Sequence, residues 1–144
     1  MKRLLTIAAL ALTVGACSSH PKSATATTRE THTITGTFTL GGSFDPDNPN
    51  FDTVEGTPYC WGTGGYDDIS SGLQVNVSNE SGTVIANGSL EDGKIHGDDC
   101  EFRFVVNNVP VAKFYKIQVG HRGELSYSYA EMQAAGWTVG FTLG

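Results

Sequence analysis

Apolar side chains recur at every second position in several short segments of this chain, and turn sequences separate the segments. In the clearest case, Cys100, Phe102 and Phe104 share one face of the segment. Glu101 and Arg103 lie between them and take the other face. This period of two is typical of a β-strand that buries one face. Four further segments show the same alternation: 32–40, 73–77, 115–119 and 137–143. The segment 83–90, which lies between two turn sequences, is also predicted to be a strand.

About seven short strands at intervals of roughly ten residues predict an all-β fold, an antiparallel β-sandwich. One segment near the C-terminus breaks the alternation. Ser128 and Glu131 have the spacing of a capping box, and Gly136 stands where a helix would end. We therefore predict one short helix over 129–135, within a domain that spans 32–144.

The first residues have the pattern of an export signal. Lys2 and Arg3 precede an uncharged apolar run, 4–15, which is followed by Ala and Cys17. The run is shorter than the roughly 20 apolar residues that a transmembrane helix needs. The four residues Val-Gly-Ala-Cys that end at Cys17 resemble the lipobox of bacterial lipoproteins, although the family often has Leu where this chain has Val14.

The lipobox resemblance implies that residues 1–16 are a lipoprotein signal peptide and that a diacylglyceryl group is attached to Cys17. Two acyl chains hold a protein stably on a membrane, whereas one chain binds only marginally. The segment 17–31 is rich in Ser, Thr and Ala and is predicted to be a flexible tether. We expect the domain to be exported, outward-facing and anchored to the cell membrane or envelope. An ordinary secretory signal that is cut elsewhere is the alternative.

The charge balance changes the expected partners. Removing residues 1–16 takes away Lys2 and Arg3, which leaves seven basic against fifteen acidic side chains and a formal charge of −8. Such a domain repels phosphate backbones, so nucleic acid is excluded as a partner. The remaining length suits one domain with its own core.

The three cysteines have separate assignments. Cys17 is assigned to lipid, which leaves Cys60 and Cys100 as a pair. Export places this pair in an oxidising compartment where disulfides persist. Neither residue has the neighbouring Cys or His spacing of a zinc site. We predict a Cys60–Cys100 disulfide.

The segment 41–58 is polar and contains three prolines, and it is predicted to be a surface loop. Asp45, Asp47 and Asp52 supply oxygen ligands of the kind that calcium prefers. The spacing departs from an EF-hand, because Pro49 occupies the fifth position and no Glu occupies the twelfth. Asp also favours turns, so a plain loop is the stronger interpretation and a calcium site the weaker one.

The folded segment carries no motif for a reaction. The segment 32–144 contains no GxSxG elbow, no Ser-x-x-Lys of the penicillin-binding type and no GxGxxG loop. We therefore expect no enzymatic activity and no cofactor. Trp61 and Tyr66, in a glycine-rich stretch, are candidates for an exposed binding patch, and His121 and Arg122 at a predicted hairpin tip are candidates for contact with an anionic partner.

The segments 73–86 and 90–93 resemble the small prealbumin-like and carboxypeptidase-regulatory sandwiches. The remainder, from Cys60 to the closing residues, is similar to small exported proteins of high-GC Gram-positive bacteria and their phages. These resemblances imply a β-sandwich at the cell surface, and we expect a non-enzymatic binding or interaction module there. The alternatives are a prophage lipoprotein that excludes related phages, a calcium-dependent carbohydrate binder or envelope enzyme, and a structural lipoprotein without a specific ligand.

Overall fold

The computed structural model describes residues 29–42 and 50–144. The predicted signal peptide, Cys17 and most of the predicted tether lie outside these residues. Two of the three candidate calcium ligands, Asp45 and Asp47, also lie outside them.

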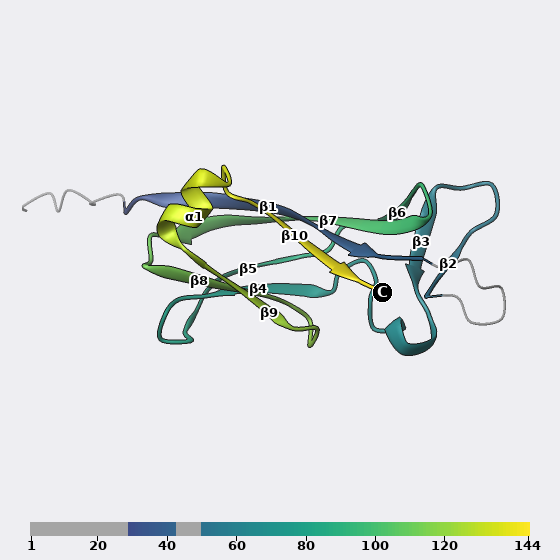
Figure 1. Ribbon diagram of the computed structural model, residues 1–144, viewed down its shortest axis with the longest axis horizontal. Coiled ribbons are helices and arrows are strands. Elements are labelled where there is room, and N and C mark those ends of the chain that lie inside the picture. Colours follow the sequence, from purple (N-terminus) through teal and green to yellow (C-terminus); the bar gives the residue numbers. More distant parts are fainter. Residues whose placement is uncertain (1–28, 43–49) are drawn as a thin grey trace, which may run out of the picture.

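The described residues form two β-sheets that lie face to face as two layers (Figure 1). The first sheet has the spatial order β10-β1-β7-β6-β3-β2, and the second has the order β5-β4-β8-β9. The strands of the first sheet are β1 (Thr31–Leu40), β2 (Phe51–Thr53), β3 (Tyr59–Gly62), β6 (Gly93–His96), β7 (Asp99–Pro110) and β10 (Thr138–Leu143). The strands of the second sheet are β4 (Gln74–Ser78), β5 (Val84–Ser89), β8 (Phe114–Val119) and β9 (Glu124–Ser128). The predicted all-β sandwich is confirmed.

The alternating apolar positions fill the space between the two layers. In β1 and β7, Phe38 and Phe102 are both fully buried, and Val75 and Ile117 meet them from the second sheet. Gly36 is part of this packing, because a Cβ atom there would lie 2.3 Å from Cζ of Phe104, its partner in the register of β1 and β7. The glycine therefore leaves room for the phenylalanine ring.

The predicted helix is present as α1 (Tyr129–Ala134), and the predicted capping box starts it. The Ser128 hydroxyl accepts a hydrogen bond from the Glu131 N–H, and the Glu131 carboxylate accepts one from the Ser128 N–H. At the other end of the helix, the Gly136 N–H donates a hydrogen bond to the carbonyl of Gln133, and the Trp137 N–H donates one to the carbonyl of Met132. This is the Schellman pattern, and it ends the helix within two residues.

One strand pair departs from the expected antiparallel arrangement. β10 runs parallel to β1, with Thr35 opposite Thr138 and Leu40 opposite Leu143. The reason is the position of α1, which follows β9 of the second sheet and delivers the chain to the first sheet at the end where β1 begins (Figure 1). Since both strands start at that end, they run in the same direction.

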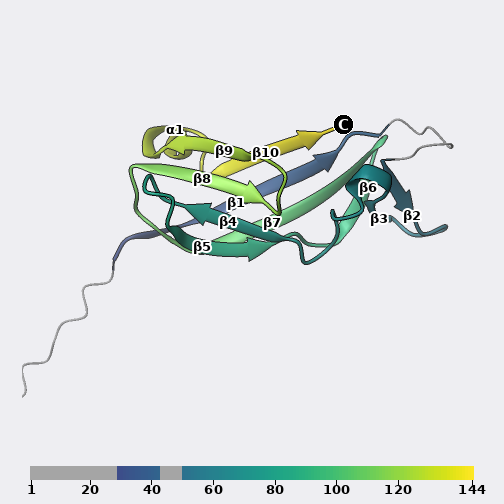
Figure 2. The same cartoon turned by 90° about the horizontal axis from the view of Figure 1, so that it is seen from below.

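The described residues contain ten strands, more than the seven or so expected from alternation. The strands without a predicted counterpart are short: β2 has three residues, β3 and β6 have four each, and β9 has five. The segment 41–58 is therefore not wholly a loop, because Phe51–Thr53 pairs with β3. Figures 1 and 2 both place β2, β3 and β6 at one end of the molecule, opposite the end that holds α1.

Candidate functional site

Two exposed aromatic side chains stand on the same face of β3. Tyr59 is 44% exposed and Trp61 is 37% exposed. Cys60, between them, points to the opposite face and is buried. This arrangement follows from the alternation of side chains along a strand: once the disulfide commits Cys60 to the interior, both neighbours face outward.

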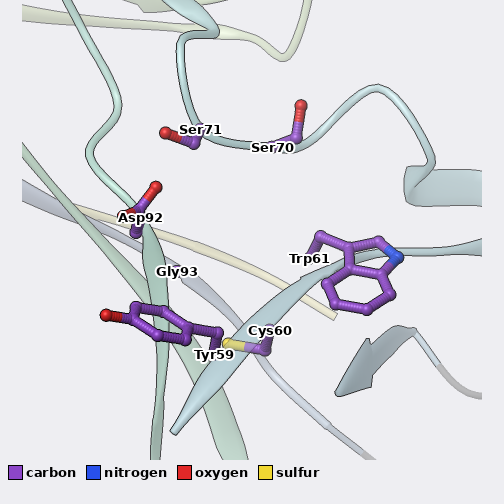
Figure 3. Close-up of a pocket in the computed structure, with 7 residues that line it drawn as sticks. All are labelled: Tyr59, Cys60, Trp61, Ser70, Ser71, Asp92 and Gly93. Carbon is purple, nitrogen blue, oxygen red and sulfur yellow. The ribbon is translucent and has the colours of Figure 1, made fainter. Parts of the chain in front are cut away.

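The two aromatic residues border the candidate pocket, a hollow of about 340 Å³ that is also lined by Ser70, Ser71, Asp92 and Gly93 (Figure 3). That volume falls within the roughly 300–1,000 Å³ typical of small-ligand sites. The serines belong to the segment between the 3₁₀ helix η1 (Gly64–Tyr66) and β4, and Asp92 directly precedes β6. Three segments far apart in the sequence therefore build the pocket.

The polar groups of the pocket have no partners elsewhere in the described chain. The Trp61 indole N–H, the Tyr59 hydroxyl and the Asp92 carboxylate make no hydrogen bond or ion pair with another described residue, and neither do the hydroxyls of Ser70 and Ser71. They are therefore available to a ligand as donors and acceptors.

The predicted disulfide is present and lies directly behind this pocket. Cys60 and Cys100 are joined with their Cα atoms 6.0 Å apart, which fastens β3 to β7. Without it, β3 is held to β6 by only two paired positions. Gly93 completes the close packing, because a Cβ atom there would lie 2.4 Å from the carbonyl oxygen of Cys60. The pocket thus has a fixed rear wall.

Tyr66 and Arg122, predicted as separate binding candidates, lie against each other outside the pocket. The Arg122 guanidinium lies 5.3 Å from the centre of the Tyr66 ring and forms an ion pair with Asp68. It also donates a hydrogen bond of 2.6 Å to the carbonyl of Gly65. The hydrogen bond from Arg122 holds the pKa of Asp68 below its ordinary value and raises the pKa of the arginine. Arg122 therefore fixes the η1 segment to the β8–β9 turn.

The remaining sequence candidates do not join the pocket. His121 is exposed at the turn before Arg122, as predicted. Asp52 lies on β2, where its carboxylate accepts a hydrogen bond of 2.7 Å from the Thr53 N–H. Residues 29–42 and 50–144 contain no group of three or more His, Cys, Asp or Glu side chains that could hold a metal ion.

Among the residues that line the pocket, Trp61 was a candidate from the sequence, whereas Tyr59, Ser70, Ser71 and Asp92 were not. Tyr59 could have been found, since a buried Cys60 places both of its neighbours on the outer face. The serines and the aspartate carried no such signal. Their approach to β3 depends on the path of the chain between η1 and β6, which local sequence does not specify.

A scan against protein-family models and searches of curated proteins and solved structures found no match to this chain. Within the described residues, no helix has the length and apolar character needed to cross a membrane.

The side chains that line the pocket are mainly aromatic rings and short polar groups. Its lining residues include one carboxylate and two serine hydroxyls, but no histidine, no lysine and no free thiol. A serine nucleophile needs an adjacent base in hydrogen-bond contact, and neither Ser70 nor Ser71 has one among the described residues.

Proposed function

We propose that this protein is an exported lipoprotein, anchored through lipid on Cys17, that acts as a non-enzymatic binding module at the cell surface. The observation that carries the proposal is the position of the candidate pocket. The pocket is lined by residues on or beside β3 and β6. These strands lie at one end of the sandwich, and β1 begins at the other end (Figures 1 and 2).

The register of β1 supports this separation. Thr31, at the start of the strand, is paired with Pro110, whereas Leu40, at its end, is paired with Cys100. Cys100 is in turn bonded to Cys60, which lies behind the pocket. Ten residues at about 3.3 Å each give β1 a length of roughly 30 Å. An anchor that precedes β1 would therefore hold the α1 end nearer the membrane and leave the pocket facing outward.

The anchor is tested by comparing the full-length chain with its C17A variant in a bacterial host. We expect the wild type to take up an alkyne-labelled fatty acid and to fractionate with membranes, and C17A to do neither. Two acyl chains are enough for stable anchoring, so no further membrane contact is needed. Unlabelled wild-type protein, or membrane retention of C17A, would overturn the anchoring part of the proposal.

The orientation is tested by photo-crosslinking on intact cells, with a benzophenone amino acid placed at Tyr59 or at Phe114. Phe114 is a matched control, because it is an exposed aromatic residue, 49% exposed, on a strand that begins near α1. We expect a discrete crosslinked product from position 59 and none from position 114. Equal products from both positions, or product from position 114 alone, would contradict an outward-facing binding site at β3.

A further inference from the structure

We infer that the candidate pocket takes a neutral oligosaccharide, bound without a metal ion, with its sugar rings against Trp61 and Tyr59 and its hydroxyls on Asp92 and the two serines. The inference rests on the proposed function, because it names the ligand class of the same site.

The two aromatic faces fit sugar rings. The C–H bonds on one side of a pyranose carry small positive charges, and the face of an aromatic ring is negative. Trp61 and Tyr59 extend in different directions from β3 (Figure 3), and their rings are not in contact. They therefore offer two separate faces to successive sugar units, rather than a closed cage around one group.

The polar groups match sugar hydroxyls. An ionised carboxylate such as Asp92 only accepts hydrogen bonds, and its two oxygens suit a pair of neighbouring hydroxyls. The hydroxyls of Ser70 and Ser71 both donate and accept, and the Trp61 indole N–H only donates. A sugar, whose hydroxyls act in both ways, can pair with groups of each of these kinds.

Other ligand classes fit the pocket less well. An anion would meet Asp92 without a balancing cation, because no lysine or arginine lines the pocket. Lys94, which is opposite Tyr59 in the register, lines a neighbouring hollow instead. A metal ion would find one carboxylate, and hard cations need several oxygen ligands. A quaternary ammonium group is best held by aromatic rings that surround it, an arrangement that the diverging rings do not make.

The inference is tested with full-length, ¹⁵N-labelled protein in detergent micelles, titrated with chitotriose, maltotriose, mannotriose or tetramethylammonium. The chain has two tryptophans, so it gives two indole N–H signals, and a W61F variant assigns them. We expect at least one trisaccharide to shift the Trp61 signal and to leave the Trp137 signal in place. The shift should persist when a calcium chelator is added.

Substitutions test whether the trisaccharide binds in the candidate pocket. In isothermal titration calorimetry, W61A and D92N should each weaken the binding of that trisaccharide by at least about tenfold, a factor that corresponds to about 1.4 kcal/mol. F114A removes an exposed aromatic side chain far from the pocket and should leave the affinity unchanged. Equal loss in F114A and W61A would overturn the assignment to this pocket.

The outcomes separate the ligand class from the proposed function. If no trisaccharide shifts the Trp61 signal, or if only tetramethylammonium does, the saccharide inference is wrong. The proposed function then still stands if crosslinking at Tyr59 captures a cell-surface product. If crosslinking at Tyr59 also fails, the proposed function fails with it.

Discussion

The two tryptophans of this chain occupy opposite ends of the sandwich and very different surroundings. Trp137 stacks on His32 with the ring centres 3.7 Å apart and meets Tyr115 and Tyr129 edge-on. The indole of Trp61 makes no ring contact or hydrogen bond with any other described residue. One indole therefore completes the packing at the α1 end, whereas the other is left open at the β3 end.

The backbone conformations of the two tryptophans also differ. Trp137 has a φ of 61°, a left-handed conformation that costs a non-glycine residue about 1–3 kcal/mol. Such a conformation persists only where its surroundings stabilise it, and here three aromatic neighbours do so. Trp61 lies in an ordinary strand and makes no such contacts. We conclude that the α1 end is organised for stability, whereas the β3 end leaves its aromatic side chains exposed.

The largest effect is expected from removing the disulfide, which joins β3 to β7. The double variant C60S/C100S should lose about 4 kcal/mol of unfolding free energy, the chain-entropy value for a loop of this size, since the two cysteines are 40 residues apart in sequence. Urea denaturation measures the loss. The C17A variant is the control and should keep the wild-type stability. A loss below about 1 kcal/mol would mean that strand pairing alone fixes β3.

Exchanging the two tryptophans for alanine tests the comparison directly. W137A should lower the unfolding free energy by about 3 kcal/mol, the lower end of the range for a buried aromatic residue, because Trp137 is only partly buried. W61A should change it by less than about 0.5 kcal/mol, as expected for a surface side chain without partners. Urea denaturation of both variants measures the two values. Similar losses in both variants would remove the distinction between the two ends.

A smaller effect is expected at the start of α1. S128A removes the hydroxyl that caps the helix and should cost about 1 kcal/mol. The helix positions Trp137, so the indole N–H signal of Trp137 should also move in the NMR spectrum of S128A. S126A is the matched control, because Ser126 is an exposed serine on the same strand, β9, and does not cap the helix. Equal stability of the two variants would show that packing, and not the cap, holds α1.

The smallest effect concerns the ion pair that joins η1 to the β8–β9 turn. Arg122 lowers the pKa of Asp68, so the stabilisation is present above the ordinary aspartate value of 3.8 and is lost as the pH falls through the lower folded value. R122Q should raise the pKa of Asp68, as measured by carboxyl NMR titration. Because Asp68 is 37% exposed and screened by solvent, the cost in stability should be below about 1 kcal/mol. R103Q, which removes an arginine that is 74% exposed, should leave the Asp68 titration unchanged.

The fold could be predicted from the sequence wherever a local residue pattern determines the structure of its own segment. The alternation in β1 and β7, the capping box at Ser128 and the pairing of Cys60 with Cys100 are all present as expected. The short strands β2 and β3 were not predicted as strands, because a segment of three or four residues is too short for alternation to distinguish a strand from a loop. They form since a neighbouring strand supplies their hydrogen bonds.

The residues of the candidate site also divide into those that the sequence marked and those that it did not. Trp61 stood out as an aromatic residue in a glycine-rich stretch, whereas Asp92 looked like an ordinary turn residue. Arg122 was expected to be open to an anionic partner, yet it forms an ion pair with Asp68, which is 54 residues away. Two residues so far apart in the sequence come into contact only when both sheets are packed, so no local sequence signal marked this ion pair.

By itself, the sequence determined the all-β class, the short helix and the disulfide, because side-chain period, capping chemistry and cysteine number act locally or by elimination. Only the tertiary structure decided that β10 runs parallel to β1 and that one tryptophan is packed while the other is open. It also decided that Ser70, Ser71 and Asp92 meet β3. These features depend on which segments become neighbours when the two sheets bury their apolar faces together, and that is a property of the whole chain.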